Sequence, residues 1–301
     1  MTVDILTIQN LNKSFGEKKV LRGLDLTVPQ NSIFGFVGRN GAGKTTAMKS
    51  VLGLLRADEG EIFVAGEKVV FGQTATNRHV GYLPDVPEFY PFMTPREYLR
   101  LCGESLGMNR AAIRKKSDEL LSLVGLSDET HRIRGFSRGM KQRLGIAQAL
   151  LASPKLLICD EPTSALDPIG RKEILDILLS VREQTTVLFS THILSDVERI
   201  CTDVALLNEG RIALQGKVDC LKEAGRTEAF TVEASGNGQA DALARAFSNV
   251  TERRGDTLVF AGGEKEFLAV LRFIAENGIS VRRAERMEPS LESLFLEVVA
   301  K

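Results

Sequence analysis

The chain has 301 residues, of which 43% are hydrophobic and 26% charged, and its 39 basic residues balance its 39 acidic ones. This length predicts one large domain with a smaller one, and the net charge of zero argues against a protein that coats a polyanion. Because the four cysteines form no CxxC pair, we expect neither a zinc ribbon nor a dithiol redox site, and we interpret them as reduced thiols.

The first predicted elements are strands. Residues 3–37 alternate apolar and polar residues between turn breaks, which indicates strands and a hairpin, and the apolar run at 32–38 ends in glycine. Residues 44–55 then show the spacing of an amphipathic helix. Strand, glycine loop and helix therefore follow in the order that a phosphate-binding unit needs.

The glycine loop carries the first chemical motif, because GRNGAGKT (38–45) fits G-x-x-x-x-G-K-[ST]. Its glycines let backbone N–H groups turn toward phosphate oxygens, and the helix start adds a partial positive charge. We expect Lys44 to reach the β- and γ-phosphates and the Thr45 hydroxyl to bind Mg²⁺. The nucleotide-binding residues expected here are Gly38, Asn40, Gly41, Ala42, Gly43, Lys44, Thr45 and Thr46.

The middle of the chain alternates helical and apolar patterns. From about 86 to 153 the pattern is mainly helical and charged. Apolar strands at 155–160 and 185–190 flank a helix near 168–183, which indicates a mostly parallel sheet. A hairpin is predicted at 205–216.

The composition changes near residues 223–230, where we place a second domain, 226–301, after a first domain of residues 1–225. Its predicted elements are strands at 229–234, 257–261 and 279–285 and helices at 239–248, 264–277 and 290–300. The last helix carries an apolar stripe of Leu291, Leu294, Phe295, Val298 and Val299. This stripe either covers its own small sheet or docks onto the main domain or a partner.

Two strands deliver candidate catalytic side chains at their carboxyl ends. In LLICDEP (156–162), Asp160 would hold Mg²⁺, directly or through water, and Glu161 would orient and deprotonate the attacking water. His192 follows the next strand, at the edge where open α/β sheets bind ligands, and we expect it to contact the γ-phosphate. His79 and His131 have no such setting and are interpreted as surface or packing residues.

A second helix start bears a glycine in FSRGMKQR (136–143). Ser137 is a good N-cap, but capping does not explain an exposed Gly139 in the first turn, where glycine costs about 0.5–1 kcal/mol relative to alanine. A helix start with a serine hydroxyl and a bare backbone is an anion site. Since the chain already has one phosphate loop, we expect this second site to face the γ-phosphate bound by another copy.

These motifs, in this order, resemble those of the ATP-binding subunit of ABC transporters over about residues 3–222. The Walker A motif is GRNGAGKT, the signature is FSRGMKQR, the Walker B motif is LLICDE, the D-loop is SALD (164–167), and the switch histidine lies in STH. The resemblance implies an α/β fold with a RecA-like P-loop core, an antiparallel β-subdomain and a helical signature subdomain at about 86–153. To this the pattern adds a small α+β C-terminal domain.

The family resemblance also implies an ATPase cycle and its partners. Phe15 would stack on adenine, and two subunits would enclose two Mg²⁺-bound ATP molecules head to tail, with Asp167 linking the sites. Ser137 and Gly139 of each subunit would close the other's site. The partners would be a second copy or a homologous ATPase and separately encoded polytopic membrane subunits, with no nucleic acid, at the cytoplasmic face of the membrane. No stretch approaches the ~20 apolar residues of a membrane span, and no signal peptide is recognisable.

The ending MEPSLESLFLEVV (287–299) resembles that of bacterial exporters of drugs, antibiotics, ions or lipid-like substrates. Which substrate is carried is not indicated. The region 226–301 would be a regulatory module, a dimer brace or a stabilising cap. A soluble ABC ATPase that acts on ribosomes or nucleic acid is the first alternative function, and a switch-type GTPase the second. The first usually carries paired ATPase modules, a long coiled coil or zinc modules, and the second lacks the signature and the D-loop.

Two positions depart from the family pattern. Arg138 stands where the signature usually has glycine, although a basic residue is frequent there in this exporter branch. Asp85 stands where the family normally has a glutamine that touches Mg²⁺ and the attacking water. Asp85 and Glu161 would repel by about 3 kcal/mol at ~5 Å and an effective dielectric constant of about 20. We therefore expect Asp85 to act in coupling or through the metal, with a tolerated surface substitution as the alternative. The apolar residues of 86–99 form helical-subdomain core, a surface for the membrane subunit, or both.

Overall fold

The computed structural model describes residues 4–224, 228–287, 290–292 and 294–295. These residues divide into two compact units, the first of which ends at Val218 while the second begins at Asp219. The sequence had placed this division at 225/226. Val298 and Val299 of the predicted apolar stripe lie outside the described residues, whereas 291–292 and 294–295 are helical as expected.

The first unit contains two sheets. The four-stranded antiparallel sheet has the order β2-β1-β4-β5, with β1 (Asp4–Phe15), β2 (Lys18–Pro29), β4 (Glu59–Val64) and β5 (Glu67–Lys68). The six-stranded sheet has the order β10-β9-β3-β8-β7-β6 and is parallel except for β10. Its strands are β3 (Ile33–Gly38), β6 (Val80–Leu83), β7 (Leu156–Cys159), β8 (Thr186–Thr191), β9 (Asp203–Asn208) and β10 (Arg211–Lys217).

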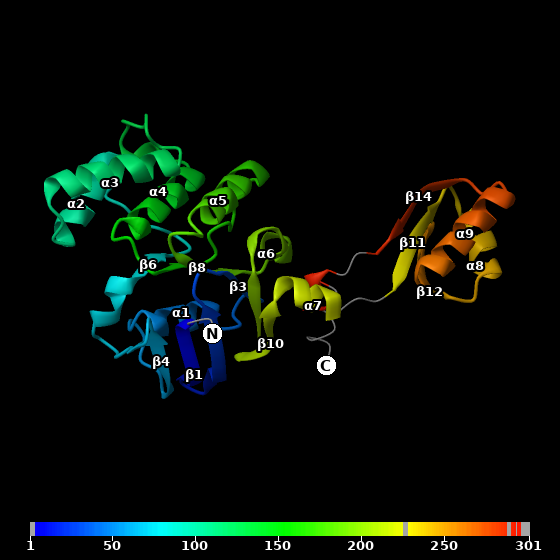
Figure 1. The fold of residues 1–301 in the computed structure, drawn as a ribbon, viewed down its shortest axis with the longest axis horizontal. Coiled ribbons are helices and arrows are strands. Elements are labelled where there is room, and N and C mark those ends of the chain that lie inside the picture. The colour runs from blue at the N-terminus through cyan, green and yellow to red at the C-terminus, as the bar shows by residue number, and fades with distance from the viewer. Residues whose placement is uncertain (1–3, 225–227, 288–289, 293, 296–301) are drawn as a thin grey trace. The chain divides into compact units, whose positions relative to one another are not determined.

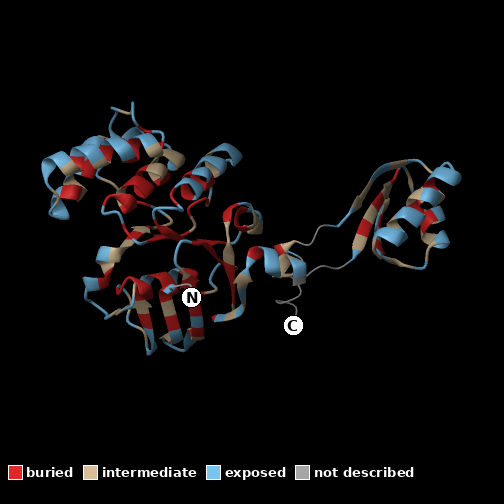
Figure 2. Ribbon diagram, in the orientation of Figure 1, coloured by how far each residue is buried: buried red, intermediate tan, exposed pale blue. Residues whose placement is uncertain are grey.

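The main core lies between these two sheets. Helix α1 (Lys44–Val51) contributes Met48 and Val51 to a buried cluster that also holds Phe34 and Phe36 of β3. All six residues of β3 are buried, as are all six of β8, which is typical of central parallel strands covered on both faces. Figure 2 shows this burial concentrated in the central strands and on the inner helix faces. The predicted order of strand, glycine loop and helix is therefore confirmed, although the helix, predicted over 44–55, ends at Val51.

The predicted helical stretch is also confirmed, as a group of three α-helices beside the six-stranded sheet (Figure 1). They are α2 (Pro95–Ser105), α3 (Arg110–Leu123) and α4 (Arg138–Leu150), with the short 3₁₀ helices η1 (Ala75–His79) and η2 (Ile133–Gly135) nearby in sequence. Each α-helix begins at a polar N-cap, since the side chains of Thr94, Asn109 and Ser137 accept hydrogen bonds from the first turn. Helices α5 (Pro168–Ser180) and α6 (Leu194–Ile200) follow β7 and β8.

The second unit begins within α7 (Val218–Ala224) and contains a small α+β fold. Its elements are β11 (Ala229–Ala234), α8 (Asn237–Ala246), β12 (Val250–Arg254), β13 (Thr257–Ala261), α9 (Glu264–Glu276) and β14 (Val281–Arg286). The antiparallel order β12-β13-β11-β14 is that of a ferredoxin-like fold. Phe230 and Phe260 stack in its core with ring centroids 4.9 Å apart. Strand β12 was missed because VTERR shows no apolar alternation.

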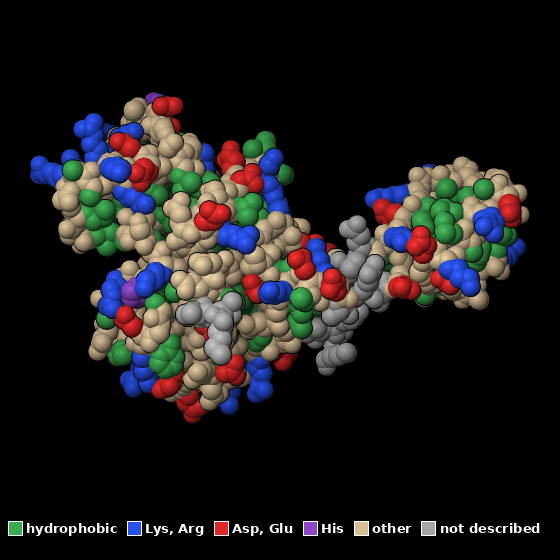
Figure 3. All heavy atoms as spheres, viewed as in Figure 1, with side chains coloured by type: hydrophobic (Ala, Val, Ile, Leu, Met, Phe, Trp, Pro, Cys, Tyr) green, Lys and Arg blue, Asp and Glu red, His purple; other side chains and the backbone are tan. Residues whose placement is uncertain are grey.

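The surface matches the balanced composition. On the face drawn in Figure 3, acidic and basic side chains are interspersed over both units. Among the described residues, no helix combines the length and hydrophobicity that a membrane crossing needs.

Candidate functional site

The candidate site lies in the first unit, where the parallel strands end. The loop after β3, the carboxylates after β7 and the histidine after β8 meet there around a cleft of about 430 Å³. Open parallel sheets bind ligands at this edge, which is why residues far apart in the sequence meet there. The cleft is lined by Val20, Asn40, Gly41, Gly43, Lys44, Thr45, Thr46, Asp85, Glu161, Ser164 and His192.

The glycine loop is shaped by its own backbone. Gly43 forms the N-cap of α1 at φ 112°, a conformation that L side chains rarely adopt, and an added Cβ would lie 2.8 Å from Leu21 Cδ2. Both the dihedral angle and the packing therefore require glycine at this position. The loop leads directly into the helix start, so it places backbone N–H groups and the positive end of the α1 dipole at the cleft.

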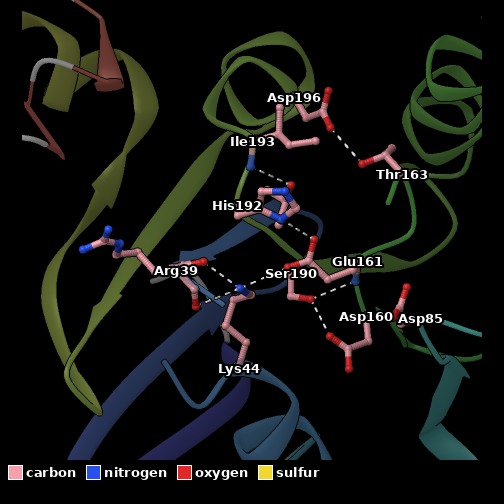
Figure 4. A network of polar contacts seen from close by, with 12 residues as sticks. Arg39, Lys44, Asp85, Asp160, Glu161, Thr163, Ser190, His192, Ile193 and Asp196 are labelled. Atoms are coloured by element: carbon pink, nitrogen blue, oxygen red, sulfur yellow. Dashed lines mark hydrogen bonds and ion pairs between the residues drawn. The ribbon is translucent and has the colours of Figure 1, made fainter. Parts of the chain in front are cut away.

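Lys44 is the cation of this cleft, although its side chain is only 6% exposed. Its Nζ donates to the carbonyl oxygen of Gly38 at 2.6 Å and lies 3.0 Å from Glu161 Oε1, an ion pair visible in Figure 4. A buried ammonium needs such partners because desolvation of an unpaired charge is costly. In the chain by itself, the charge that we expect to bind phosphates is thus paired with the candidate catalytic base.

Glu161 is held from three sides. Its backbone has φ 48°, which is rare for a non-glycine residue and is typical of strained functional sites. Its N–H donates to Ser190 Oγ at 2.9 Å, and its Oε2 lies 2.9 Å from His192 Nδ1. Because Ser190 also donates to Asp160 Oδ1 at 2.6 Å, one hydroxyl on β8 binds the Asp160 carboxylate and the Glu161 backbone N–H (Figure 4).

The expected metal ligands are hard oxygen donors. Asp160 is buried, Thr45 is exposed at the start of α1, and Asp85 lines the same cleft as Thr45. Within the described part of the chain, no cluster of three or more His, Cys, Asp or Glu side chains is arranged to hold a metal by itself. Mg²⁺ at phosphate sites usually takes one or two protein oxygens together with substrate phosphates and water, so these residues fit it.

Asp85 follows β6 and contacts α4, the helix that begins in the signature motif. Its Oδ1 accepts a hydrogen bond from Arg138 Nη2 at 3.1 Å, and its backbone oxygen accepts one from Gln142 Nε2 at 2.7 Å. The sequence did not predict β6, the short edge strand that brings Asp85 beside the cleft.

Seven expected residues are absent from the lining of this cleft as the described residues form it: Phe15, Gly38, Ala42, Ser137, Gly139, Asp160 and Asp167. Phe15 is 51% exposed at the end of β1. Ser137 caps α4 by accepting from Met140 N at 3.2 Å, and Asp167 caps α5 by accepting from Gly170 N at 3.0 Å. Gly139 is half-buried rather than exposed, yet an added Cβ would meet no described atom closer than 3.9 Å.

Three site residues were missed by sequence reasoning. Ser164 lies in the quoted SALD motif, but Val20 comes from the other sheet and has no local signal. Ser190 precedes the FSTH histidine by two residues, and only its contacts with the Asp160 carboxylate and the Glu161 backbone N–H identify its role. His79 and His131 lie outside the cleft lining and pair instead with Glu67 at 3.2 Å and Glu129 at 2.7 Å.

Comparison with known proteins places this site in context. A family model described as "ABC transporter" matches residues 21–164. The ABC transporter ATP-binding protein YxlF of Bacillus subtilis is 37% identical over 298 residues, which cover 98% of this chain and 99% of that protein. The bacitracin transport ATP-binding protein BcrA of Bacillus licheniformis is 36% identical over 303 residues, which cover 98% of this chain and 97% of that protein.

A solved structure gives the same result for the fold. The chain superposes on the "ATP binding subunit of ABC transporter" with a TM-score of 0.66 and 30% sequence identity, over 73% of this chain and 92% of that one. The likeness confirms the α/β fold with its RecA-like P-loop core that the motifs implied.

Proposed function

Because the chain belongs to the ATP-binding subunits of ABC transporters, an ATPase family, we propose that it powers export through separate membrane subunits. The proposal rests above all on two contacts between residues far apart in sequence: Lys44 Nζ lies 3.0 Å from Glu161 Oε1, and His192 Nδ1 lies 2.9 Å from Glu161 Oε2. A phosphate-binding cation, a base and an imidazole at one helix start are the groups that ATP hydrolysis needs.

ATP would bind with its phosphates on the glycine loop and its adenine against Phe15. The backbone N–H groups of the loop and Lys44 would hold the phosphates, and Thr45, Asp160 and Asp85 would hold Mg²⁺. When bound there, Mg²⁺ would supply charge neutralisation for the phosphates. Ser190 would keep the Asp160 carboxylate oriented, since it already donates to it at 2.6 Å.

Glu161 would act as the general base. Its two oxygens pair with Lys44 and His192. When phosphates pair with Lys44, one oxygen of Glu161 becomes free to accept a proton from the attacking water, while His192 contacts the γ-phosphate. Positioning and charge stabilisation would supply most of the rate enhancement.

Two copies would close head to tail around two ATP molecules. The observation in support is Gly139, because no described side chain of its own chain needs the space that the missing Cβ leaves. Glycine lowers helix stability, and no packing within the chain requires it at this position. A ligand that approaches the backbone would explain it. Ser137, with its hydroxyl at the same helix start, would contact the same phosphate, and Asp167 would link the two sites.

Membrane subunits would dock beside the cleft. Val86, Tyr90 and Phe92 are 61%, 52% and 60% exposed, so this part of 86–99 is surface, whereas Phe89 packs edge-on against Tyr98. Exposed apolar side chains gathered in one loop are typical of a partner contact. The relative BcrA is named for bacitracin transport, and we propose a similar antibiotic-like or other amphipathic substrate for the exporter. Its ATPase would sit at the cytoplasmic face of the membrane through these subunits.

The test is an affinity purification of the tagged full chain from gently solubilised membranes of its host, followed by mass spectrometry. A polytopic membrane protein at near-equal stoichiometry is expected. Recovery only from the soluble fraction, together with ribosomes or nucleic acid, would overturn the transport assignment and leave the ATPase chemistry standing.

A further inference from the structure

The two positions that depart from the family pattern contact each other. Arg138 and Asp85, 53 residues apart in sequence, form an ion pair at 3.1 Å. Asp85 lines the nucleotide cleft, and Arg138 is the first residue of α4, between Ser137 and Gly139. One ion pair therefore joins the chain's own cleft to the helix start that would face a second copy.

The backbone around Asp85 is fixed to the same helix. Gln142, which is fully buried, donates to the Asp85 carbonyl oxygen at 2.7 Å. Leu83 packs so closely on Gly145 that an added Cβ would lie 2.4 Å from Leu83 Cδ1. Positions 138, 142 and 145 share one face of α4, so the loop and the helix should move as one body.

Of the contacts between the Asp85 loop and α4, the Arg138–Asp85 ion pair is the one that can break at little cost. The side chains of Arg138 and Asp85 are 40% and 47% exposed, and exposed ion pairs contribute little to stability, equivalent to about five-fold or less in an equilibrium constant. The Asp85 carboxylate can therefore change partners at little cost. The Arg138 guanidinium is then free to bind phosphate, because a planar guanidinium can donate two parallel hydrogen bonds to phosphate oxygens.

We propose that Arg138 is a positioning residue that holds Asp85 away from the metal while the cleft is without nucleotide. The inference rests on the proposed function, because it assumes that Asp85 is a metal ligand and that α4 faces a second copy. In the MgATP-loaded chain Asp85 turns from Arg138 to the metal. Arg138 then becomes the counter-charge for the phosphate that the second copy binds, so that loading one cleft prepares the other.

The first measurement is nucleotide affinity of the isolated full chain, with MgATP and with ATP in EDTA. In Arg138→Gln, MgATP should bind about 2- to 5-fold more tightly while binding in EDTA stays unchanged, because Asp85 no longer has a competing partner. In an Asp85→Asn background the same substitution should have no effect. Arg134→Gln is the matched control, since Arg134 is exposed, lies four residues earlier and has no side-chain partner among the described residues.

The second measurement is MgATP-driven dimerisation in a Glu161→Gln background, by analytical ultracentrifugation. Here Arg138→Gln should weaken dimerisation several-fold, although it tightens MgATP binding by the single chain, and Arg138→Lys should restore part of the loss. If Arg138 had only a structural role, Arg138→Gln would weaken both MgATP binding and dimerisation.

An unchanged Mg²⁺-dependent affinity in Arg138→Gln, or an equal change in the Asp85→Asn background, would overturn the proposal. Both readouts use the ATPase chain alone. Failure of the exporter assignment, seen in the membrane purification, is therefore distinguishable from failure of this inference.

Discussion

The starts of α1 and α4 each carry a glycine that we expect to lie beside phosphate, and only the glycine of α1 is explained by its own chain. At α1, Gly43 has φ 112° and Leu21 occupies the space of a side chain, while Lys44 pairs with Glu161. At α4, Gly139 has no described neighbour within 3.9 Å of an added Cβ, and Ser137 does no more than cap the helix. The difference supports the proposal that a second copy completes the α4 start, whereas the contacts of the α1 start come from its own chain.

The largest effect is expected when the candidate general base of the α1 site, Glu161, is replaced. Glu161→Gln should lower the ATP turnover number by about 100- to 10,000-fold, because an amide cannot accept the proton from water. ATP binding should persist or tighten, since Lys44 loses its competing partner. Steady-state hydrolysis and equilibrium ATP binding measure the two effects. Glu183→Gln, at an exposed position outside the cleft lining, is the control, and turnover at the normal rate would refute the role of Glu161.

The second prediction compares the two glycines directly. Gly43→Ala should lower the free energy of unfolding by about 2 kcal/mol or more, because alanine is strained at positive φ and meets Leu21. Gly139→Ala should leave it unchanged or raise it by up to about 1 kcal/mol, as alanine favours a helix. Urea denaturation followed by circular dichroism measures both. A large destabilisation by Gly139→Ala would show that its own chain does need this glycine.

The third prediction concerns adenine binding at the α1 site. Phe15→Ala should weaken ATP binding by about 10-fold, in line with about 1–3 kcal/mol for stacking a base on an aromatic ring. Phe15→Tyr keeps the ring and should bind as the natural chain does. The decisive comparison is ATP against inorganic triphosphate, which has no base. If both lose affinity equally in Phe15→Ala, the stacking role is wrong.

The smallest expected effect separates capping from phosphate contact at α4. Ser137→Ala should lower the free energy of unfolding by about 1 kcal/mol through loss of the N-cap bond to Met140. Ser137→Asp keeps a good cap and should preserve stability, but its negative charge should block MgATP-driven dimerisation. Denaturation and ultracentrifugation provide the two readouts. Dimerisation of Ser137→Asp at natural strength would argue that no phosphate approaches this helix start.

Much of the first unit was predictable because its signals are local. The strand, loop and helix at 32–55, the apolar strands before Asp160 and His192, and the hairpin that turns at Gly210 were all expected and are present. The weak elements were missed. Strand β6 has four residues at a sheet edge, and β12 is an exposed edge strand of charged side chains. The four residues of β6 are too few to show a period, and β12 exposes four of its five residues and so lacks the alternation of a half-buried strand.

The sequence by itself determined the chemistry of this protein, because phosphate binding depends on residue types at fixed spacing along one loop and one helix start. It determined the phosphate loop, the candidate base Glu161 and the histidine that follows β8. Only the tertiary structure decided how these groups are paired before ATP arrives. The contacts of Glu161 with Lys44 and His192, and of Asp85 with Arg138, join residues 31 to 117 positions apart. Such contacts depend on which strands lie side by side, and no local pattern specifies that.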